Sequence, residues 1–248
     1  AEVAWRDDAA TRSDEVNWCR KRVCWVVRLV IDFHIVDWLT FTVALLLGVA
    51  VLGAAFAEVI FVLASEHLVE DFLDCGSVCW SCGNGALTAL LYDSLNRVVG
   101  VDFSKFLISV AQRDFQKSGV YEYIVDDANQ YLKNTDEGEL FNKVLLYGCF
   151  AYFPDAKSTL SLLRKQLPNV QRVFIGNMPD LDLVDRFYYN SVPTQIELLD
   201  FNSKIGIWRT EKQFSELCQQ AGWNAQFTRM PKEFYAAHYR YDVILTPI

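Results

Sequence analysis

Two glycines and an aspartate near the middle of the chain have the types and order of residues that hold a nucleotide-like cofactor. Gly83 and Gly85 lie in the segment CGNGALT, and Asp102 ends the later apolar run VVGVD. Glycine at a strand-to-helix turn lets the backbone approach a ligand closely, and an acid at the end of the next strand accepts hydrogen bonds from ribose hydroxyls. The alternative role for Asp102 is to stabilise the following helix through its dipole. The loop before it favours the cofactor role.

Three cysteines, Cys75, Cys79 and Cys82, lie close to the same turn and suggest a zinc site. No second pair of Cys or His residues follows at ligand spacing, so we expect no metal. The seven cysteines of the chain show no repeated pair spacing. This favours reduced thiols in a cytosolic setting over a disulfide framework.

The elements that must position these residues alternate between short apolar runs and helical patterns from about Glu70 onward. The sequence predicts strands at 97–102, 121–127, 141–148 and 171–177, with helices at 104–119 and 156–167. Ser104 is the expected N-cap of the first of these helices, and Gly119 its expected stop. Strands separated by helices of this length imply a parallel sheet that is covered on both faces.

The C-terminal part follows a different pattern. A helix is expected at 210–222, and two strands, 223–230 and 239–248, follow with no helix between them. This predicts an antiparallel pair at one edge of the sheet. The expected fold class is therefore α/β, a Rossmann-like doubly wound mixed sheet with a C-terminal antiparallel strand pair and an N-terminal helical segment.

The glycine segment lacks the third glycine of a dinucleotide-binding loop. With its spaced acid it resembles the class I S-adenosylmethionine (SAM)-dependent methyltransferases, whose first motif is D-x-G-x-G-x-G and whose second strand ends in an acid. Over most of residues 69–248, VVGVDFS is similar to the second motif, DDANQYL to the segment whose aspartate contacts the adenine amine, and FNKVLLYGCFAYF to the fourth strand and the turn facing the methyl group. FSELCQQAGW is similar to the last helix and turn. The resemblance implies SAM as the cofactor, with contacts from Phe103, Asp127, Ala128 and Tyr147.

The residues just before the glycines fit the first motif in two registers. If Ser77 to Ser81 are looped out, the strand ends near Asp74 and Gly76, which supply the acid and the first glycine. If the strand is uninterrupted, Cys79 stands in place of the acid and Ser81 in place of the first glycine. Either register alters the cofactor loop. We expect the loop to hold the cofactor through Asp74, Gly76, Cys82, Gly83 and Gly85, together with Asp102.

Further polar and aromatic residues lie at or after the carboxyl ends of predicted strands, where ligands bind in open α/β sheets. We expect the substrate to contact Tyr152, Asn177, Tyr188 and Tyr189, and the segment 176–190 to form a lid. The alternative is that the aromatic residues are ordinary core. His238, just before the last strand, is the candidate catalytic base, and its alternative is a surface histidine.

The first part of the chain has another character. Residues 38–64 form an almost uninterrupted apolar run whose only charge is Glu58, and the run is long enough to cross a bilayer. Basic residues precede the run and acids follow it, which would place the glycine loop away from the cytosolic cofactor. We therefore expect a helix that covers the sheet rather than a membrane span, with no cleavable signal peptide. The expected domains are 1–68 and 69–248.

The net charge of -8 argues against a broad phosphate-binding surface, so we expect no nucleic-acid partner. The resemblance implies a SAM-dependent methyltransferase, and we expect it to be cytoplasmic and to act on oxygen, nitrogen or carbon of a small molecule. Two alternatives stay open. One is a non-catalytic methyltransferase-like module that binds a partner protein through its apolar N-terminal segment, and the other is a membrane-attached lipid methyltransferase.

Overall fold

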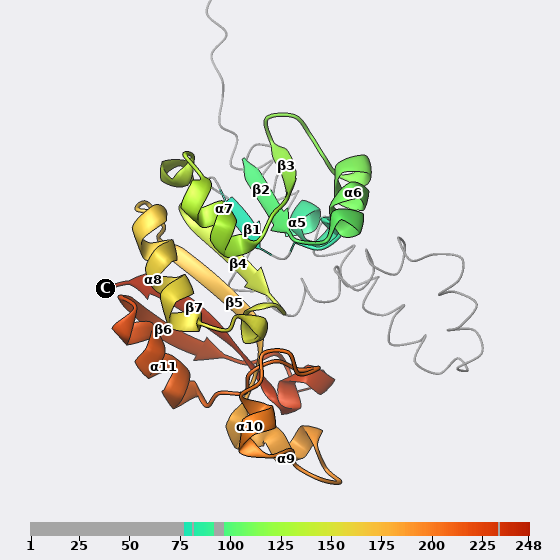
Figure 1. Ribbon diagram of the computed structural model, residues 1–248, viewed down its shortest axis with the longest axis vertical. Coiled ribbons are helices and arrows are strands. Elements are labelled where there is room, and N and C mark those ends of the chain that lie inside the picture. Colours follow the sequence, from blue (N-terminus) through green and yellow to red (C-terminus); the bar gives the residue numbers. More distant parts are fainter. Residues whose placement is uncertain (1–76, 81, 92–96, 233) are drawn as a thin grey trace, which may run out of the picture. The chain divides into compact units, whose positions relative to one another are not determined.

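The computed structural model describes residues 77–80, 82–91, 97–232 and 234–248. These residues belong to one compact unit built on a seven-stranded sheet (Figure 1). The predicted N-terminal helical segment, the boundary between 1–68 and 69–248, and the apolar run 38–64 lie outside the described residues and stay predictions. Among the residues that are described, no helix has both the length and the apolar character needed to cross a membrane.

The strands of the sheet are β1 (Ser77–Trp80), β2 (Val98–Asp102), β3 (Tyr121–Val125), β4 (Lys143–Tyr147), β5 (Arg172–Pro179), β6 (Trp223–Thr228) and β7 (Arg240–Pro247). Their order in the sheet is β3-β2-β1-β4-β5-β7-β6. The first five strands are parallel, and β7 is antiparallel to both β5 and β6. The predicted mixed sheet with a C-terminal antiparallel pair is confirmed.

Helices cover both faces of this sheet. They are α5 (Ala86–Leu91), α6 (Lys105–Asp114), α7 (Ala128–Asn134), α8 (Ala156–Gln166) and α11 (Glu211–Gln220). Figure 1 shows α7, α8 and α11 on one face and α5 and α6 on the other. Leu160 and Leu163 of α8 and Phe214 of α11 pack in the core of the first face. Every residue of β2 is buried, as expected for a central parallel strand covered on both sides.

The helix predicted at 104–119 is shorter in the structure. Ser104 is its N-cap, as expected, because its side chain accepts a hydrogen bond from the backbone N–H of Leu107. The helix ends at Asp114, and Gly119 is not its stop. Gly119 has a φ of 74° in the turn that leads into β3, where the N–H of Lys117 donates to the carbonyl of Tyr121.

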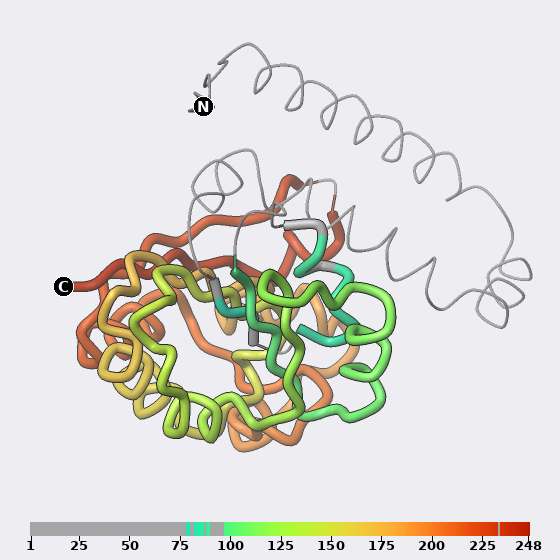
Figure 2. The backbone as a smooth tube through the Cα atoms, turned by 90° about the horizontal axis from the view of Figure 1, so that it is seen from above, coloured from blue at the N-terminus to red at the C-terminus, as the bar shows by residue number. Residues whose placement is uncertain are grey.

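A small cap is inserted between β5 and α11. It contains the 3-10 helix η3 (Leu181–Leu183) and the short helices α9 (Val184–Phe187) and α10 (Gln195–Leu198). Its own core is formed by Leu198, Trp208 and Tyr239 with partly buried neighbours. The predicted lid at 176–190 is therefore divided, because its first residues extend β5. The view from above shows the C-terminus at the side opposite the green segment that contains α6 (Figure 2).

Candidate functional site

The turn between β1 and α5 is shaped by its two glycines. Gly83 and Gly85 have φ values of 58° and 80°, a region that side chains with a Cβ rarely adopt. A Cβ on Gly85 would lie 2.8 Å from Cε1 of Tyr123 and 2.9 Å from Cβ of Ala111, whereas a Cβ on Gly83 would meet nothing within 4 Å. Gly85 therefore lets the turn pack against α6 and β3, and Gly83 leaves the backbone open to a ligand.

The structure adopts the uninterrupted register before this turn. Ser77 to Trp80 pair residue by residue with β2 on one side and β4 on the other. The looped-out interpretation is wrong at this point, because the residues it removes form the strand itself. Asp74 and Gly76, which that interpretation placed at the cofactor, lie outside the described residues, as does Ser81. Cys79 replaces the acid, and its burial raises the pKa of the thiol to about 12, which keeps it neutral.

Asp102 connects the end of β2 to the glycine turn. The residue is 6% exposed, its Oδ2 accepts a hydrogen bond from the N–H of Gly83 at 3.0 Å, and its Oδ1 accepts one from the N–H of Ser104 at 2.8 Å. The carboxylate thus faces the turn, as the cofactor role requires, and it also contacts the start of α6. The next residue, Phe103, is 78% exposed and offers an apolar ring beside the same corner.

The end of β3 carries a second acid. Asp127 is the N-cap of α7, and its Oδ1 accepts from the N–H groups of Asn129 at 2.9 Å and Gln130 at 3.1 Å. Both bonds use the same oxygen, and within the described part of the chain Oδ2 has no hydrogen bond. Ala128 is the first residue of α7. The exposed Asp127 carboxylate can therefore cap its helix and still accept a hydrogen bond from a ligand amine.

The carboxyl ends of β4 and β5 lie beside the first residues of the antiparallel strand β7. Together they form the other part of the sheet edge at which the parallel strands end. Asn177 has a φ of 68°, the only positive value for a non-glycine residue in the described ranges, and it lies at a register shift between β5 and β7. Asp242 of β7 is 3% exposed and accepts a hydrogen bond from the N–H of Asn177 at 2.7 Å. Burial raises the pKa of Asp242 to about 6, against the opposing effects of this bond and of Arg229 and Arg240. Burial, together with the nearby Asp242, also raises the pKa of Tyr147.

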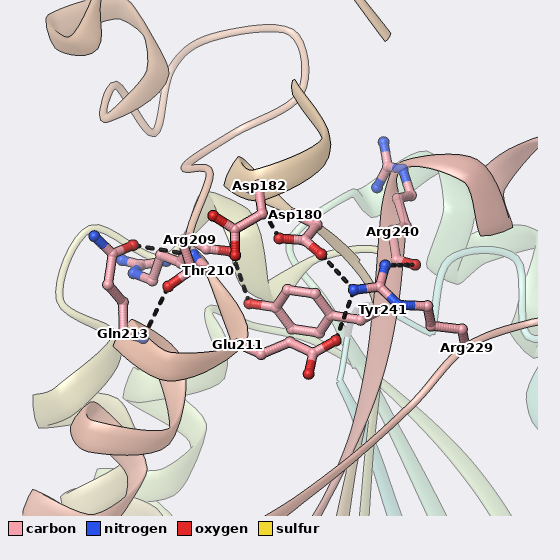
Figure 3. Close-up of polar contacts among 9 residues, drawn as sticks. All are labelled: Asp180, Asp182, Arg209, Thr210, Glu211, Gln213, Arg229, Arg240 and Tyr241. Carbon is pink, nitrogen blue, oxygen red and sulfur yellow. Dashed lines mark hydrogen bonds and ion pairs between the residues drawn. The ribbon is translucent and has the colours of Figure 1, made fainter. Parts of the chain in front are cut away.

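An ion-pair network fixes the cap to the sheet next to these residues (Figure 3). Arg229 donates to the buried carboxylate of Asp180 and, at 2.6 Å, to Oε1 of Glu211. The N–H of Leu181 donates to the carbonyl of Arg209, and the hydroxyl of Tyr241 donates to the same carbonyl at 3.2 Å. Both ends of the inserted segment are therefore held at the end of β5.

A family model described as "Methyltransferase domain" matches residues 72–230. The chain belongs to this methyltransferase family. It is thus a SAM-dependent methyltransferase, and the cofactor predicted from the sequence is confirmed. No curated protein matches the chain by sequence.

Solved methyltransferase structures share the fold at low sequence identity. Magnesium protoporphyrin IX methyltransferase from Synechocystis PCC 6803, with bound SAH, has a TM-score of 0.52 and 12% identity, covering 99% of this chain and 90% of that chain. The plantazolicin methyltransferase BamL, in complex with a triazolic desmethylPZN analog and SAH, has a TM-score of 0.52 and 12% identity, covering 69% and 76%. A SAM-dependent methyltransferase from Methanosarcina mazei has a TM-score of 0.52 and 14% identity, covering 74% and 98%. These similarities show the fold.

The structure of this methyltransferase brings most of the predicted site residues to one edge. Cys82, Gly83, Gly85 and Asp102 meet at the glycine turn, with the N–H of Cys82 bonded to the carbonyl of Val101. The residues at the ends of the neighbouring strands are Phe103, Asp127, Ala128, Tyr147 and Asn177. Their roles toward SAM and the acceptor stay predictions.

Four of the predicted residues lie elsewhere. The hydroxyl of Tyr152 donates to the carbonyl of Lys204 at 2.8 Å, and the ring of Tyr188 packs against Phe187 and Trp208 in the cap. Tyr189 is 81% exposed. His238 is exposed at the end of a 3-10 helix, η4 (Tyr235–His238), and no described contact joins it to Tyr147 or Asn177. These contacts are compatible with the alternative roles, core or surface, that the sequence left open, and the predicted roles of the four residues stay predictions.

Sequence reasoning missed Asp242 and its link to Asn177. One signal was available, because Asp242 is an acid inside the apolar strand YRYDVILTPI. An acid on a buried strand needs a partner or a function. Its partner, the backbone N–H of Asn177, belongs to a strand far away in the sequence. Of the three clustered cysteines that suggested zinc, Cys75 lies outside the described residues, so the expectation of no metal there stays a prediction; within the described ranges no three His, Cys, Asp or Glu side chains could hold a metal ion.

Proposed function

We propose that this methyltransferase transfers the methyl group of SAM to an oxygen, nitrogen or carbon atom of a small molecule. The observation that carries the proposal is the hydrogen bond between Asp102 and the N–H of Gly83. It places an acceptor carboxylate and a backbone free of side chains at the same corner of the sheet. That corner follows β1, next to the point between β1 and β4 where the strand order reverses. Open α/β sheets bind their ligands at such a point.

The residues of this corner fit SAM by their chemistry. The turn at Gly83 lets the backbone approach the cofactor, and the Asp102 carboxylate can accept hydrogen bonds from the ribose hydroxyls. Phe103 offers an apolar face, and Oδ2 of Asp127 can accept a bond from the adenine amine. Cys79 departs from the usual acid. Because its thiol is neutral, the turn has one negative charge fewer than in the family pattern.

When bound, SAM supplies a methyl carbon that is activated by the attached sulfonium. The protein's task is then to align the acceptor with that carbon and to remove a proton where the acceptor requires it. The carboxyl ends of β1 and β4 are neighbours in the sheet, so an acceptor held at the end of β4 would lie next to the cofactor turn.

A small-molecule acceptor is supported by the charge of the chain and by its neighbours. A net charge of -8 is unfavourable for binding nucleic acid. Magnesium protoporphyrin IX methyltransferase and the plantazolicin methyltransferase are named for small or modified substrates. The cap of α9 and α10 adds aromatic surface beyond β5, including the exposed ring of Tyr189.

Calorimetric titration with SAM and with SAH tests the cofactor site. We expect saturable heat for the wild-type protein and strongly weakened binding for Asp102→Ala. Asp114→Asn is the matched control, because this exposed carboxylate pairs with Arg113 at the far end of α6. No heat with either ligand at saturating concentration would favour the non-catalytic binding module instead.

The proposed location is the cytoplasm, where SAM is made. The rival is a lipid methyltransferase attached to a membrane through residues 38–64. Fractionation of cells that express the full chain separates the two. Recovery in the membrane pellet, with release by detergent but not by high salt, would favour the lipid enzyme.

A further inference from the structure

We propose that Tyr147, Asn177 and Asp242 form the acceptor-binding site, and that Asp242 takes the proton from an N–H or O–H group of the acceptor as it is methylated. This inference rests on the proposed function and narrows it. It assigns the acceptor to the class of amines and hydroxyl compounds rather than carbon nucleophiles. It also replaces His238 as the candidate base.

Three polar groups of these residues have no hydrogen-bond partner among the described residues. Oδ1 of Asn177 is buried without a partner. Asp242 accepts only the N–H of Asn177 through Oδ1, and within the described ranges its Oδ2 and the hydroxyl of Tyr147 have no hydrogen bond. Of the three, Asn177 Oδ1 is the fully buried atom, and leaving such an atom unpaired costs about 1–3 kcal/mol. A ligand that donates N–H or O–H groups would remove this cost, since two of the three groups are obligate acceptors.

The backbone holds the Asn177 side chain near the end of β4. The N–H of Gly148, the residue after β4, donates to the carbonyl of Gly176 at 3.0 Å, and a Cβ on Gly148 would lie 3.6 Å from Nδ2 of Asn177. The carbonyl of Asn177 accepts from Nη1 of Arg240 at 2.5 Å. Asn177 is thus fixed on both sides of its left-handed conformation. Such strain in a non-glycine residue persists where the surroundings impose it, and it is common at functional sites.

The charges around Asp242 suit a proton acceptor. The groups that influence it are Tyr147 of β4, the backbone of Asn177 in β5, and the guanidinium groups of Arg229 and Arg240. The pKa of about 6 leaves the carboxylate ionised at neutral pH and yet more basic than an ordinary aspartate. A general base works best when its pKa lies near the working pH.

The proposed step balances as a displacement. The lone pair of the acceptor nitrogen or oxygen forms the new bond to the methyl carbon, and the carbon–sulfur bond breaks with its electron pair going to sulfur. The proton of the acceptor passes to Oδ2 of Asp242, which later releases it to solvent. No oxidant or second cofactor is needed.

The buried negative charge of Asp242 destabilises the fold at neutral pH. A residue kept only for stability would not carry this charge, so its stability effect separates a functional role from a structural one. Because the folded-state pKa of Asp242 is raised above the ordinary value, the fold favours the protonated form, and stability falls as the pH rises through about 6. Asn at this position keeps an oxygen for the N–H of Asn177 and carries no charge. We therefore expect Asp242→Asn to melt at the same or a higher temperature than wild type at pH 8.

The first measurement uses binding alone. The carboxyl signal of Asp242 is followed by 13C NMR in the full chain saturated with SAH, assigned by its absence in Asp242→Asn, during titration with benzylamine and with phenol. We expect a saturable shift with at least one probe, and a matching loss of probe binding in Asn177→Gly. Glycine accepts a φ of 68° without strain, so this variant keeps the fold. SAH binding with no response of Asp242 to either probe would overturn the proposed acceptor site. Failure to bind SAH would instead overturn the proposed function.

The second measurement uses turnover with labelled SAM and a panel of amines, phenols and β-dicarbonyl compounds. We expect transfer to amines or phenols, with a rate that falls as the pH drops below about 6. Asp242→Asn should lose at least about 100-fold in kcat and the acidic limb of the profile, with unchanged affinity for SAM. Asp114→Asn should match wild type. Full activity of Asp242→Asn, or transfer to carbon acceptors alone, would contradict the proposal.

Discussion

The two halves of the sheet are held together in different ways. The half formed by β1, β2 and β3 has a glycine turn packed on Tyr123 and one carboxylate joined to that turn, and its ion pairs, from Arg97 to Glu122 and Glu137, are partly exposed. The half formed by β4 to β7 depends on side chains, with Arg229 between two acids and Asp242 at the irregular pairing of β5. The half proposed to bind the cofactor is thus built around a glycine turn and the acid at the end of the next strand. The half proposed to bind the acceptor is built from contacts particular to this chain.

The largest expected effect tests the cofactor half. Asp102→Ala removes the acceptor of the Gly83 and Ser104 N–H groups and of the ribose hydroxyls. Hydrogen bonds to a charged group contribute roughly 1.5–3 kcal/mol each, so the Kd for SAM should rise about 100-fold. Asp102→Asn keeps one acceptor oxygen and should lose only about tenfold. Equal, unchanged affinities in both variants would remove the special role of this corner.

The strongest test of the other half is Arg229→Met. The change leaves Asp180 buried without its partner, and breaking a buried pair costs about 3 kcal/mol. Urea unfolding should show this loss. Arg113→Met is the matched control, because Arg113 pairs with Asp114 on the surface and should change stability little. If both variants unfolded alike, the ion pair with the buried Asp180 would stabilise the fold no more than the surface pair of Arg113.

A matched pair of glycine substitutions sharpens the cofactor side. Gly85→Ala places a Cβ against Tyr123 and Ala111 in addition to its unfavourable φ, and should cost about 2–3 kcal/mol. Gly83→Ala meets no neighbour and should cost only about 1–2 kcal/mol from its φ. Thermal unfolding of both variants checks this difference. A larger loss for Gly83→Ala would mean that packing of the turn on α6 matters less than its conformation.

The smallest effect concerns the start of α11. The side chains of Thr210 and Gln213 each accept a hydrogen bond from the other residue's backbone N–H in a capping box. Thr210→Ala should reduce the free energy of unfolding by about 1 kcal/mol, while Thr210→Ser should be close to neutral. Denaturant titration measures both. A loss as large as that of Arg229→Met would show that the helix terminus, rather than the ion pair, anchors the cap.

The sequence predicted the parts of the molecule that depend on local patterns. The strand ending in Asp102, the N-cap at Ser104 and the antiparallel pair of β6 and β7 all follow from short-range periodicity and capping. The register before Gly83 was not decided, because the spacing of acids and glycines favoured Asp74 while strand pairing places Ser77 to Trp80 in the sheet. The Asp242–Asn177 contact joins two strands that only the folded sheet brings together. Its left-handed backbone has only a weak marker in sequence, because Asn adopts this region more readily than other non-glycine residues but is common elsewhere too.

The bond from Asp102 to Gly83 also bears on how the cofactor enters. The carboxylate of Asp102 holds the peptide N–H of Gly83 at the corner proposed to face the nucleoside. When the cofactor binds, its ribose hydroxyls would compete with the N–H of Gly83 for the Asp102 carboxylate. The affinity for SAM should therefore depend less on ordering a flexible loop than on how well the ribose hydroxyls replace the Gly83 N–H as donors to Asp102.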